Sequence, residues 1–347
     1  MNHISNILEY PFASTPDPGE TMEVAPGVHW LRMPLPMSLN HINLYLIEGD
    51  QDWTIVDTGI RGEETSELWK QIFADRLGDK PVGQIICTHM HPDHTGQAGF
   101  LSDYWRAPLL MSYSEYYQAR VMGSMMQEGG SWHMSDFFIR AGVTMETLEA
   151  MRDMRSSFTP SADDTPLPKS YLRLSEGDTL KIGANEWEII VGTGHSPEHV
   201  CLYCKELRVF ISGDQILPVI TSNVSVHPTE PLANPLSDWL DSHLKLMTLI
   251  PDDTLILPAH NEPFYGVRLR LQQLIEHHEE RMKIVLDQCV TPKKAIDLLP
   301  HLFERKLEDH AIFMALGEGI AHIHCLEAKG RIRKTRQGDH FLYQTIQ

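Results

Sequence analysis

The sequence predicts a mixed α/β fold in which helices cover β-sheets, with one helical insertion and a small helical module at the C-terminal end. Three observations support this prediction. Blocks in which apolar and polar residues alternate, as they do in half-buried strands, recur between residues 39 and 260. A stretch rich in methionine, aromatic residues and helix formers separates these blocks at 113–165. After residue 268 the apolar residues recur at helical spacing instead.

The first third of the chain is predicted to form a hairpin, a helix and a buried strand. The segment 39–49 alternates apolar and polar residues, and 51–59 follows it after a short turn, which is the pattern of a β-hairpin. A helix is predicted at 63–78, because its apolar residues have helical spacing and it ends on a glycine. The apolar run QIICT at 84–88 predicts a buried strand, so the polar segment HMHPDHTG that follows it lies at a strand end.

The insertion at 113–165 has two interpretations. Its methionine and aromatic side chains can form an adaptable apolar lid over an acyl or aryl substrate. In the alternative, the insertion is a pair of helices that packs on the domain or contacts a second copy of the chain. The side chains concerned are Met122, Met125, Met126, Met134, Tyr116, Tyr117, Trp132 and Phe137.

Strand patterns resume after a loop at 159–170, and they predict that the chain is not a continuous βαβ winding. The predicted strands lie within 172–194, 200–214 and 254–260. Because strands are followed by helices and then by strands again, the pattern favours sheets that helices cover.

The C-terminal part is predicted to be a separate small module. Three helical patterns follow residue 268, and the chain closes with two short strands around a Gly-Asp turn. Three helices and a two-stranded wing make a winged-helix module. We therefore predict two domains, a catalytic domain at 1–268 and a winged-helix module at 269–347, in line with the length of 347 residues.

Composition and charge exclude several classes of protein. Hydrophobic residues make up 42% and charged residues 22%, as in an ordinary globular chain, and no run approaches the roughly 20 apolar residues of a spanning helix. The N-terminal residues do not have the pattern of a secretory signal, and five cysteines do not make a disulfide framework, so we expect a cytoplasmic protein without membrane contact. The net charge of −18 disfavours nucleic acid as a partner.

Charge is also distributed unevenly along the chain. Residues 270–347 hold 12 Lys and Arg against 11 Asp and Glu, a net +1. The remainder, with 17 and 36, therefore carries −19. Nucleic-acid affinity depends largely on neutralising phosphates with Lys and Arg. The predicted catalytic part is thus poorly suited to RNA.

The motif with the clearest chemistry is His89-x-His91-x-Asp93-His94, which places four metal-ligand side chains within six residues. A strand end followed by a turn lets neighbouring side chains point into one cavity from different directions. Imidazoles with one carboxylate suit zinc, while iron or manganese are alternatives. The competing interpretation is a histidine-rich polar loop that holds no metal.

Three further candidates follow apolar runs later in the chain: His195 in GTGHSPEH, Asp214 in ISGDQ and His260 in LPAHNEP. A single histidine after a strand is more often a surface or hydrogen-bonded residue than a ligand. Together, however, the three share one pattern, because each ends an apolar run beside glycine or proline. They are therefore candidate ligands of the same site.

These segments, in this order, resemble the five-part signature of the metallo-β-lactamase superfamily, which VDTG at 56–59 would open. The resemblance spans residues 29–265 and implies an αββα sandwich with a two-metal site at one edge of its sheets. By this resemblance His89, His91 and His195 hold one zinc, and Asp93, His94 and His260 hold the second. Asp214 bridges both metals, and Asp57 orients the ligands by hydrogen bonds. His199 is either a contact behind the ligands, a contact to the substrate or an exposed turn histidine.

The resemblance also implies a reaction, in which a hydroxide bridging the two metals attacks a substrate. Asp93 and Asp214 are the residues that would orient this nucleophile or move its proton. The segment around His195 resembles that of glyoxalase II, a thioesterase. The leading hypothesis is therefore hydrolysis of a small acyl substrate, namely a thioester, ester or lactone.

Two alternatives come from other classes of function. The C-terminal segment ALGEGIAHIHCLEAKGRIRK resembles the winged-helix extension of a subgroup that includes a mitochondrial endoribonuclease and many bacterial hydrolases. This favours a single-strand endoribonuclease, for which Arg331, Arg333, Lys334 and Arg336 are the only basic cluster. A regulatory protein without catalysis is the third hypothesis, which the complete ligand set disfavours. Under any of these hypotheses, the winged-helix module can also pack on the rest of the chain or assemble a homodimer.

Overall fold

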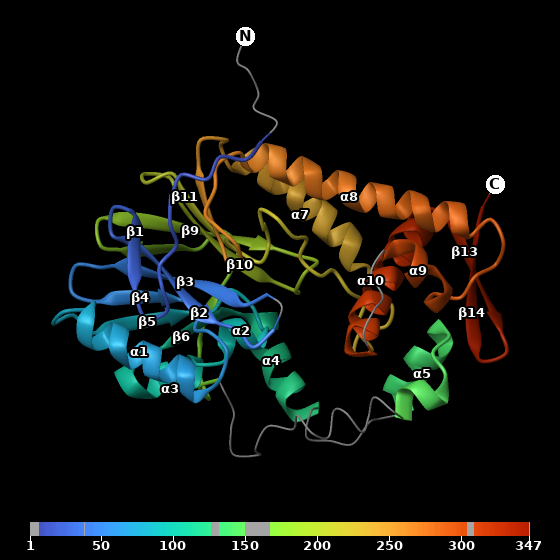
Figure 1. Ribbon diagram of the computed structural model, residues 1–347, viewed down its shortest axis with the longest axis horizontal. Coiled ribbons are helices and arrows are strands. Elements are labelled where there is room, and N and C mark those ends of the chain that lie inside the picture. The colour runs from blue at the N-terminus through green and yellow to red at the C-terminus, as the bar shows by residue number, and fades with distance from the viewer. Residues whose placement is uncertain (1–6, 38, 126–131, 150–166, 304–308, 347) are drawn as a thin grey trace, which may run out of the picture. The chain divides into compact units, whose positions relative to one another are not determined.

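The computed structural model describes residues 7–37, 39–125, 132–149, 167–303 and 309–346. By its internal contacts the chain divides into two compact units (Figure 1). The first unit contains residues 1–123, 163–222 and 246–271, and the second contains 124–162, 223–245 and 272–347. The predicted domain boundary between residues 268 and 269 stays a prediction, because compact units that are defined by their contacts need not coincide with domains.

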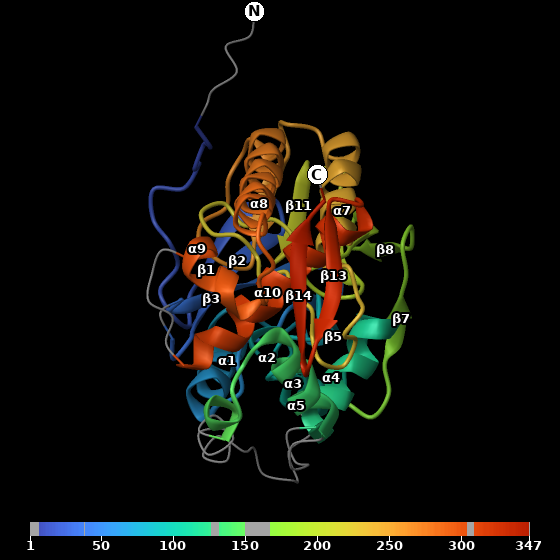
Figure 2. The same cartoon turned by 90° about the vertical axis from the view of Figure 1, so that its right-hand side faces the viewer.

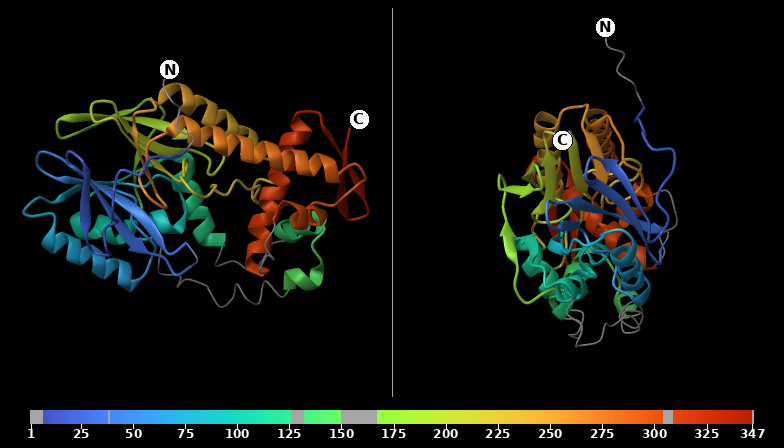
Figure 3. Two further views of the ribbon diagram at one scale, coloured as in Figure 1. Left: turned by 45° about the horizontal axis from the view of Figure 1, so that its top comes forward. Right: turned by 90° about the vertical axis from the view of Figure 1, so that its left-hand side faces the viewer.

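The first unit contains two β-sheets, which Figure 3 shows as two stacked layers. One sheet has seven strands in sequence order: β1 (Thr21–Ala25), β2 (Val28–Pro34), β3 (His41–Glu48), β4 (Trp53–Val56), β5 (Val82–Ile86), β6 (Leu109–Ser112) and β7 (Leu172–Leu174). The other sheet has the order β12-β11-β10-β9-β8, with β8 (Thr179–Ile182), β9 (Asn185–Gly192), β10 (His199–Cys204), β11 (Val209–Gly213) and β12 (Leu255–Pro258).

The seven-stranded sheet changes from antiparallel to parallel at β4. Strands β1 to β4 pair antiparallel, as the predicted hairpin requires, whereas β4 to β7 pair in parallel. Parallel neighbours need crossover connections. The first two of these are α1 (Glu63–Asp75) between β4 and β5, and α2 (Pro92–Thr95) with α3 (Ala98–Trp105) between β5 and β6. A βαβ run is therefore present in this half of the sandwich, although the chain as a whole is not wound continuously.

Apolar side chains fill two layers of the first unit. One layer lies between the sheets and includes Trp30, Ile86 and Trp187, all fully buried. The second layer lies on the other face of the seven-stranded sheet, where Trp69 of α1 and Leu101 of α3 pack on the strands. These two apolar layers and two sheets confirm the predicted mixed α/β sandwich.

The second unit combines helices with a hairpin (Figure 2). Its elements include α5 (Trp132–Ala141), most of α8 (Val267–Gln288), the 3₁₀ turn η1 (Ile296–Leu298), α9 (Leu299–Leu302), α10 (Asp309–Ala328), β13 (Ile332–Gln337) and β14 (His340–Thr345). The two predicted strands around Gly338-Asp339 are confirmed as an antiparallel pair. Helix α7 (Pro235–Leu249) contributes its first part to this unit. The winged-helix description stays a prediction.

The predicted insertion is divided between the two units. Helix α4 (Tyr113–Met125) lies mainly in the first unit, where Tyr116 stacks on Tyr171 with ring centroids 3.9 Å apart. Helix α5 belongs to the second unit, where the ring of Phe138 packs on that of Phe313 with centroids 4.3 Å apart. Residues 126–131, which include Met126, and residues 150–165 of the insertion lie outside the described residues. The lid stays a prediction.

The structure was also searched for membrane-spanning helices. Within the described part of the chain, no helix is both long enough and apolar enough to cross a bilayer.

Candidate metal centre and active site

The seven predicted ligands all follow strands of the first unit. His89 and His91 follow β5, and Asp93 and His94 lie in the short helix α2 directly after them. The other three come from the five-stranded sheet, at the ends of β9, β11 and β12: His195, Asp214 and His260. Both sheets therefore contribute donors to one place.

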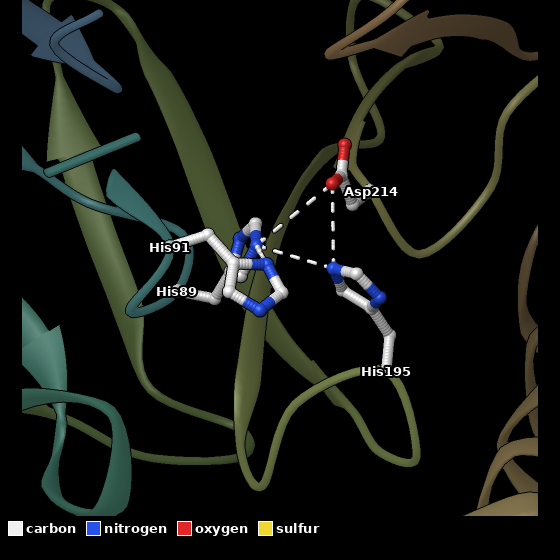
Figure 4. Close-up of side chains that lie close together, drawn as sticks. All are labelled: His89, His91, His195 and Asp214. Carbon is white, nitrogen blue, oxygen red and sulfur yellow. Dashed lines mark hydrogen bonds and ion pairs between the residues drawn. The ribbon is translucent and has the colours of Figure 1, made fainter. Parts of the chain in front are cut away.

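The first group consists of His89, His91, His195 and Asp214, whose donor atoms all lie within 4.8 Å of one another (Figure 4). Nε2 of His89 lies 2.7 Å from Nδ1 of His91 and 3.2 Å from Nε2 of His195. The carboxylate of Asp214 reaches the His195 nitrogen at 3.3 Å. Nitrogen atoms from three imidazoles thus converge on one point beside a carboxylate.

The second group consists of Asp93, His94 and His260. Oδ2 of Asp93 lies 3.7 Å from Nε2 of His94 and 3.5 Å from Nε2 of His260. Asp214 connects the two groups, because its Oδ2 lies 3.6 Å from His94 and its Oδ1 lies 3.4 Å from His260. The structure therefore brings all seven predicted residues together, with Asp214 in the bridging place.

The donor set fits divalent metal ions. Nε2 of His94 and Oδ1 of Asp214 are buried, and neither has a hydrogen-bond partner among the described residues. Buried polar atoms without partners are costly unless an ion or water satisfies them. Five imidazoles and two carboxylates are the ligand types that zinc accepts. Each of the two groups could hold a metal ion.

Burial and nearby charges set the protonation of the histidines. Burial lowers the pKa of the His89 imidazole, and it lowers the pKa of His91 to about 3. Burial also acts to lower the pKa of His94, but three neighbouring aspartates outweigh it and raise this pKa well above its usual value. Two of these imidazoles are thus neutral and ready to bind a cation, whereas His94 must release its proton when a metal binds.

The carboxylates are ionised. Burial opposes ionisation of Asp93, yet His94 and His260 hold its pKa at about 2. For Asp214 the same two histidines outweigh burial and hold the pKa well below its usual range. Both carboxylates are thus in the state that binds a cation, whereas the charged His94 and His260 beside them must release protons when a metal binds.

Asp57, which the resemblance assigns to orienting the ligands, contacts this part of the site. Its Oδ2 lies 2.8 Å from Nδ1 of His94, and its Oδ1 accepts the backbone N–H of Thr88 at 2.8 Å. Asp57 has a left-handed φ of 62°, which turns the chain sharply after β4. A carboxylate on the second nitrogen of a ligand histidine fixes its tautomer and the direction of its ring.

His199 is fully buried, so the alternative of an exposed turn histidine is wrong. Its ring stacks on His89 at 4.7 Å, and its Nε2 accepts the backbone N–H of Asp214 at 3.1 Å. Gly213, with a φ of 50°, lets this ring approach, since a Cβ there would lie 2.5 Å from the ring. His199 therefore holds the start of the Asp214 loop from behind the ligands.

The sequence interpretation missed the residues that position His260. The hydroxyl of Tyr45 and the amide of Asn43, both on β3, donate to the carbonyl oxygen of Pro258 at 2.8 and 2.9 Å. His260 in turn directs its Nδ1 to the backbone oxygen of His41 at 2.9 Å. The only sequence signal was a polar residue, Asn43, within an otherwise apolar predicted strand.

A third group of donor atoms lies in the second unit, where His278, Glu318 and His322 are buried together. The two imidazoles hydrogen-bond to each other at 3.0 Å, and His322 also contacts the backbone oxygen of Glu318 at 2.7 Å. The guanidinium of Arg281 lies 3.6 Å from the Glu318 carboxylate and already supplies the opposite charge. We therefore interpret this group as a polar core network.

This network makes stability depend on pH. Burial lowers the pKa of His322 from 6.5 to about 4. As the pH falls from 6.5 to 4, the unfolded chain binds a proton here that the folded chain does not, so the free energy of unfolding decreases. Between pH 7 and 4.5, the free energy of unfolding of His322→Gln is therefore expected to decrease by roughly 2–3 kcal/mol less than that of the wild type. Urea unfolding of both proteins across this range tests the effect, and parallel pH profiles would contradict it.

Comparison with known proteins agrees with this geometry. The metallo-beta-lactamase superfamily profile matches residues 38–260, and a metallo-beta-lactamase-like C-terminal domain profile matches residues 282–344. A crystal structure of a beta-lactamase domain protein from Burkholderia ambifaria is 41% identical, covers 98% of both chains and superposes with a TM-score of 0.89.

Two curated relatives carry functional names. A probable metallo-hydrolase of Bacillus subtilis, YqjP, is 25% identical over 91% of this chain and 97% of its own. The acyl-coenzyme A thioesterase MBLAC2 of Gallus gallus is 23% identical over 70% of this chain and 80% of its own. The convergent histidines and aspartates, the sandwich around them and these matches lead to one conclusion: this chain is a hydrolase of the metallo-beta-lactamase superfamily.

Proposed function

We propose that this chain hydrolyses small acyl substrates, with thioesters as the first class, by means of two divalent metal ions. The observation that carries the proposal is the place of Asp214, which lies within 3.3–3.9 Å of histidine nitrogens in both donor groups. His89, His91, His195 and Asp214 would hold one ion, and Asp93, His94, His260 and Asp214 the other. Zinc is the ion that this donor set favours.

Bound metals would activate a water molecule as the nucleophile and polarise the substrate carbonyl. The chain's own groups perform the remaining steps. The Asp93 side chain is about one-fifth exposed, whereas that of Asp214 is about one-tenth exposed. The Asp93 carboxylate is therefore the ionised group that a substrate can reach, and it can accept the proton of the attacking water and pass it to the leaving thiolate. Asp57 and His199 keep the ligands in place during turnover.

Charge and similarity favour an acyl substrate over RNA. The portion outside residues 270–347 carries −19, which repels phosphates. Of the basic cluster near β13, Lys334 is already paired with Glu327 at 3.5 Å. One relative, MBLAC2, is named as an acyl-coenzyme A thioesterase, which matches the resemblance of the His195 segment to glyoxalase II. These charges disfavour the alternative function, that of a single-strand endoribonuclease.

Thiol release from a panel of acyl-coenzyme A and acyl-glutathione thioesters tests the proposal directly. Zinc-loaded protein is expected to release thiol, while the Asp93→Ala variant serves as the blank and shows at least about 10²-fold less. Lactones and aryl esters extend the panel within the same class of reaction. A protein that is inactive on the whole panel but cleaves single-stranded RNA would overturn the acyl assignment.

A further inference from the structure

Glu115 is a fully buried carboxylate in the first turn of α4, outside the predicted site. Its Oε2 accepts the backbone N–H of Met90 at 2.9 Å, and its Oε1 accepts the backbone N–H of Glu198 at 2.8 Å. Each carboxylate oxygen therefore contacts a different loop. Hydrogen bonds from backbone amides to an ionised carboxylate are short and strong, so they hold the two loops to this side chain.

The two amides belong to the loops that carry the first donor group. Met90 lies between His89 and His91, and Glu198 lies three residues after His195. One side chain thus joins the segments that supply all three imidazoles of this group. The Asp93, His94 and His260 group has its own support, because Asp57 holds His94 and β3 holds the loop of His260.

The contact is reciprocal, which makes it a clamp. Oε2 of Glu198 accepts the backbone N–H of Ser114 at 2.8 Å. The backbone oxygen of Glu198 accepts the hydroxyl of Ser112 at 2.7 Å. Three hydrogen bonds therefore join residues 112–115 to Glu198, and a fourth joins Glu115 to Met90. Several short bonds from one segment restrain both ligand loops more than a single bond would.

Charge adds to this geometry. Burial raises the pKa of Glu115, whereas the two backbone amides oppose this shift because they donate hydrogen bonds to the ionised form. A cation at the first donor group would act in the same direction as these amides, because a nearby positive charge favours an ionised carboxylate.

We infer that Glu115 is a positioning residue that sets the metal affinity of the His89–His91–His195 group selectively over that of the Asp93–His94–His260 group. The inference rests on the proposed metal-dependent function. It assigns a specific task to the start of the helical insertion, whose first turn sets the spacing of the ligand loops.

Zinc affinity of the full chain tests the inference. Competition with a chromophoric chelator yields the dissociation constants of wild type and Glu115→Gln. Glutamine retains the shape but removes the charge and directs a donor toward one of the two amides. We expect one zinc to bind about 10–100-fold more weakly, the range for lost support of metal ligands, while the other constant stays within about threefold. Cobalt substitution should show the same selectivity, as a changed visible spectrum for one of the two ions.

Matched variants separate a selective effect from a general one. Glu318→Gln removes another buried carboxylate, in the second unit, and should leave both zinc constants unchanged. Equal weakening of both constants in Glu115→Gln, or no change in either, would overturn the inference. If Glu115→Gln does not fold, Ser112→Ala can replace it, because this variant removes only one bond of the clamp. We expect the same zinc ion to bind severalfold more weakly to Ser112→Ala. Unchanged zinc binding would overturn the inference. These readouts need no substrate, so a failure on thioesters would contradict the proposed function without affecting this test.

Discussion

Replacing Asp214 with alanine is expected to remove hydrolysis almost completely, by on the order of 10⁴-fold or more in kcat, and to lower the number of bound zinc ions. The reason is its position: its two carboxylate oxygens approach His195 and His260 at 3.3 and 3.4 Å, and so belong to both donor groups. Steady-state thiol release together with metal analysis of the purified variant measures both effects.

The control for this prediction is Asp93→Ala, which affects the second donor group alone. This variant should still bind one zinc, because His89, His91 and His195 remain beside Asp214. Retention of two zinc ions by Asp214→Ala would show that this residue does not connect the groups. Retention of activity with fewer ions would show that one metal is sufficient for turnover.

The second large effect concerns stability, and it is expected for Asp57→Ala. Asp57 is buried and accepts hydrogen bonds from the amide and the hydroxyl of Thr88, while it also contacts Nδ1 of His94. Alanine leaves these donors buried without this acceptor, and breaking a buried charged pair of this kind costs about 3–5 kcal/mol. Alanine must also adopt a φ of 62°, which adds roughly 1–2 kcal/mol.

Asp57→Asn is the matched control for this loss. Asparagine tolerates the left-handed backbone and retains one acceptor oxygen. We therefore expect Asp57→Asn to lower the free energy of unfolding clearly less than Asp57→Ala does. Urea unfolding of metal-free protein measures the difference without a contribution from bound metal. A free energy of unfolding that is equal in wild type and Asp57→Ala would mean that the pair with His94 contributes nothing to the fold.

The candidate ligands were predictable because their signal is local. His89, His91, Asp93 and His94 lie within six residues after a recognisable strand, and the other ligands each end an apolar run. The hairpin of β3 and β4 and the helix α1 were predictable for the same reason, since alternation and helical spacing are properties of short segments.

Features that depend on distant contacts were not predictable. Glu115 meets Glu198 across 83 positions, and Asn43 meets Pro258 across 215, so nothing near either residue indicates its partner. His199 presents the same difficulty, because only the fold shows that the strand it begins is buried and that its ring stacks on His89. Strands β1 and β2 were not assigned either, although β2 buries most of its residues within the sandwich.

The origin of the ligands on two different sheets has a consequence for how the protein matures. His89, His91, Asp93 and His94 come from the seven-stranded sheet, while His195, Asp214 and His260 come from the five-stranded one. Neither sheet alone can assemble a complete coordination sphere, so full-affinity metal capture must follow the docking of the sheets during folding. Metal ions bound by these residues would link the two sheets, and they would stabilise only chains whose sheets have assembled correctly.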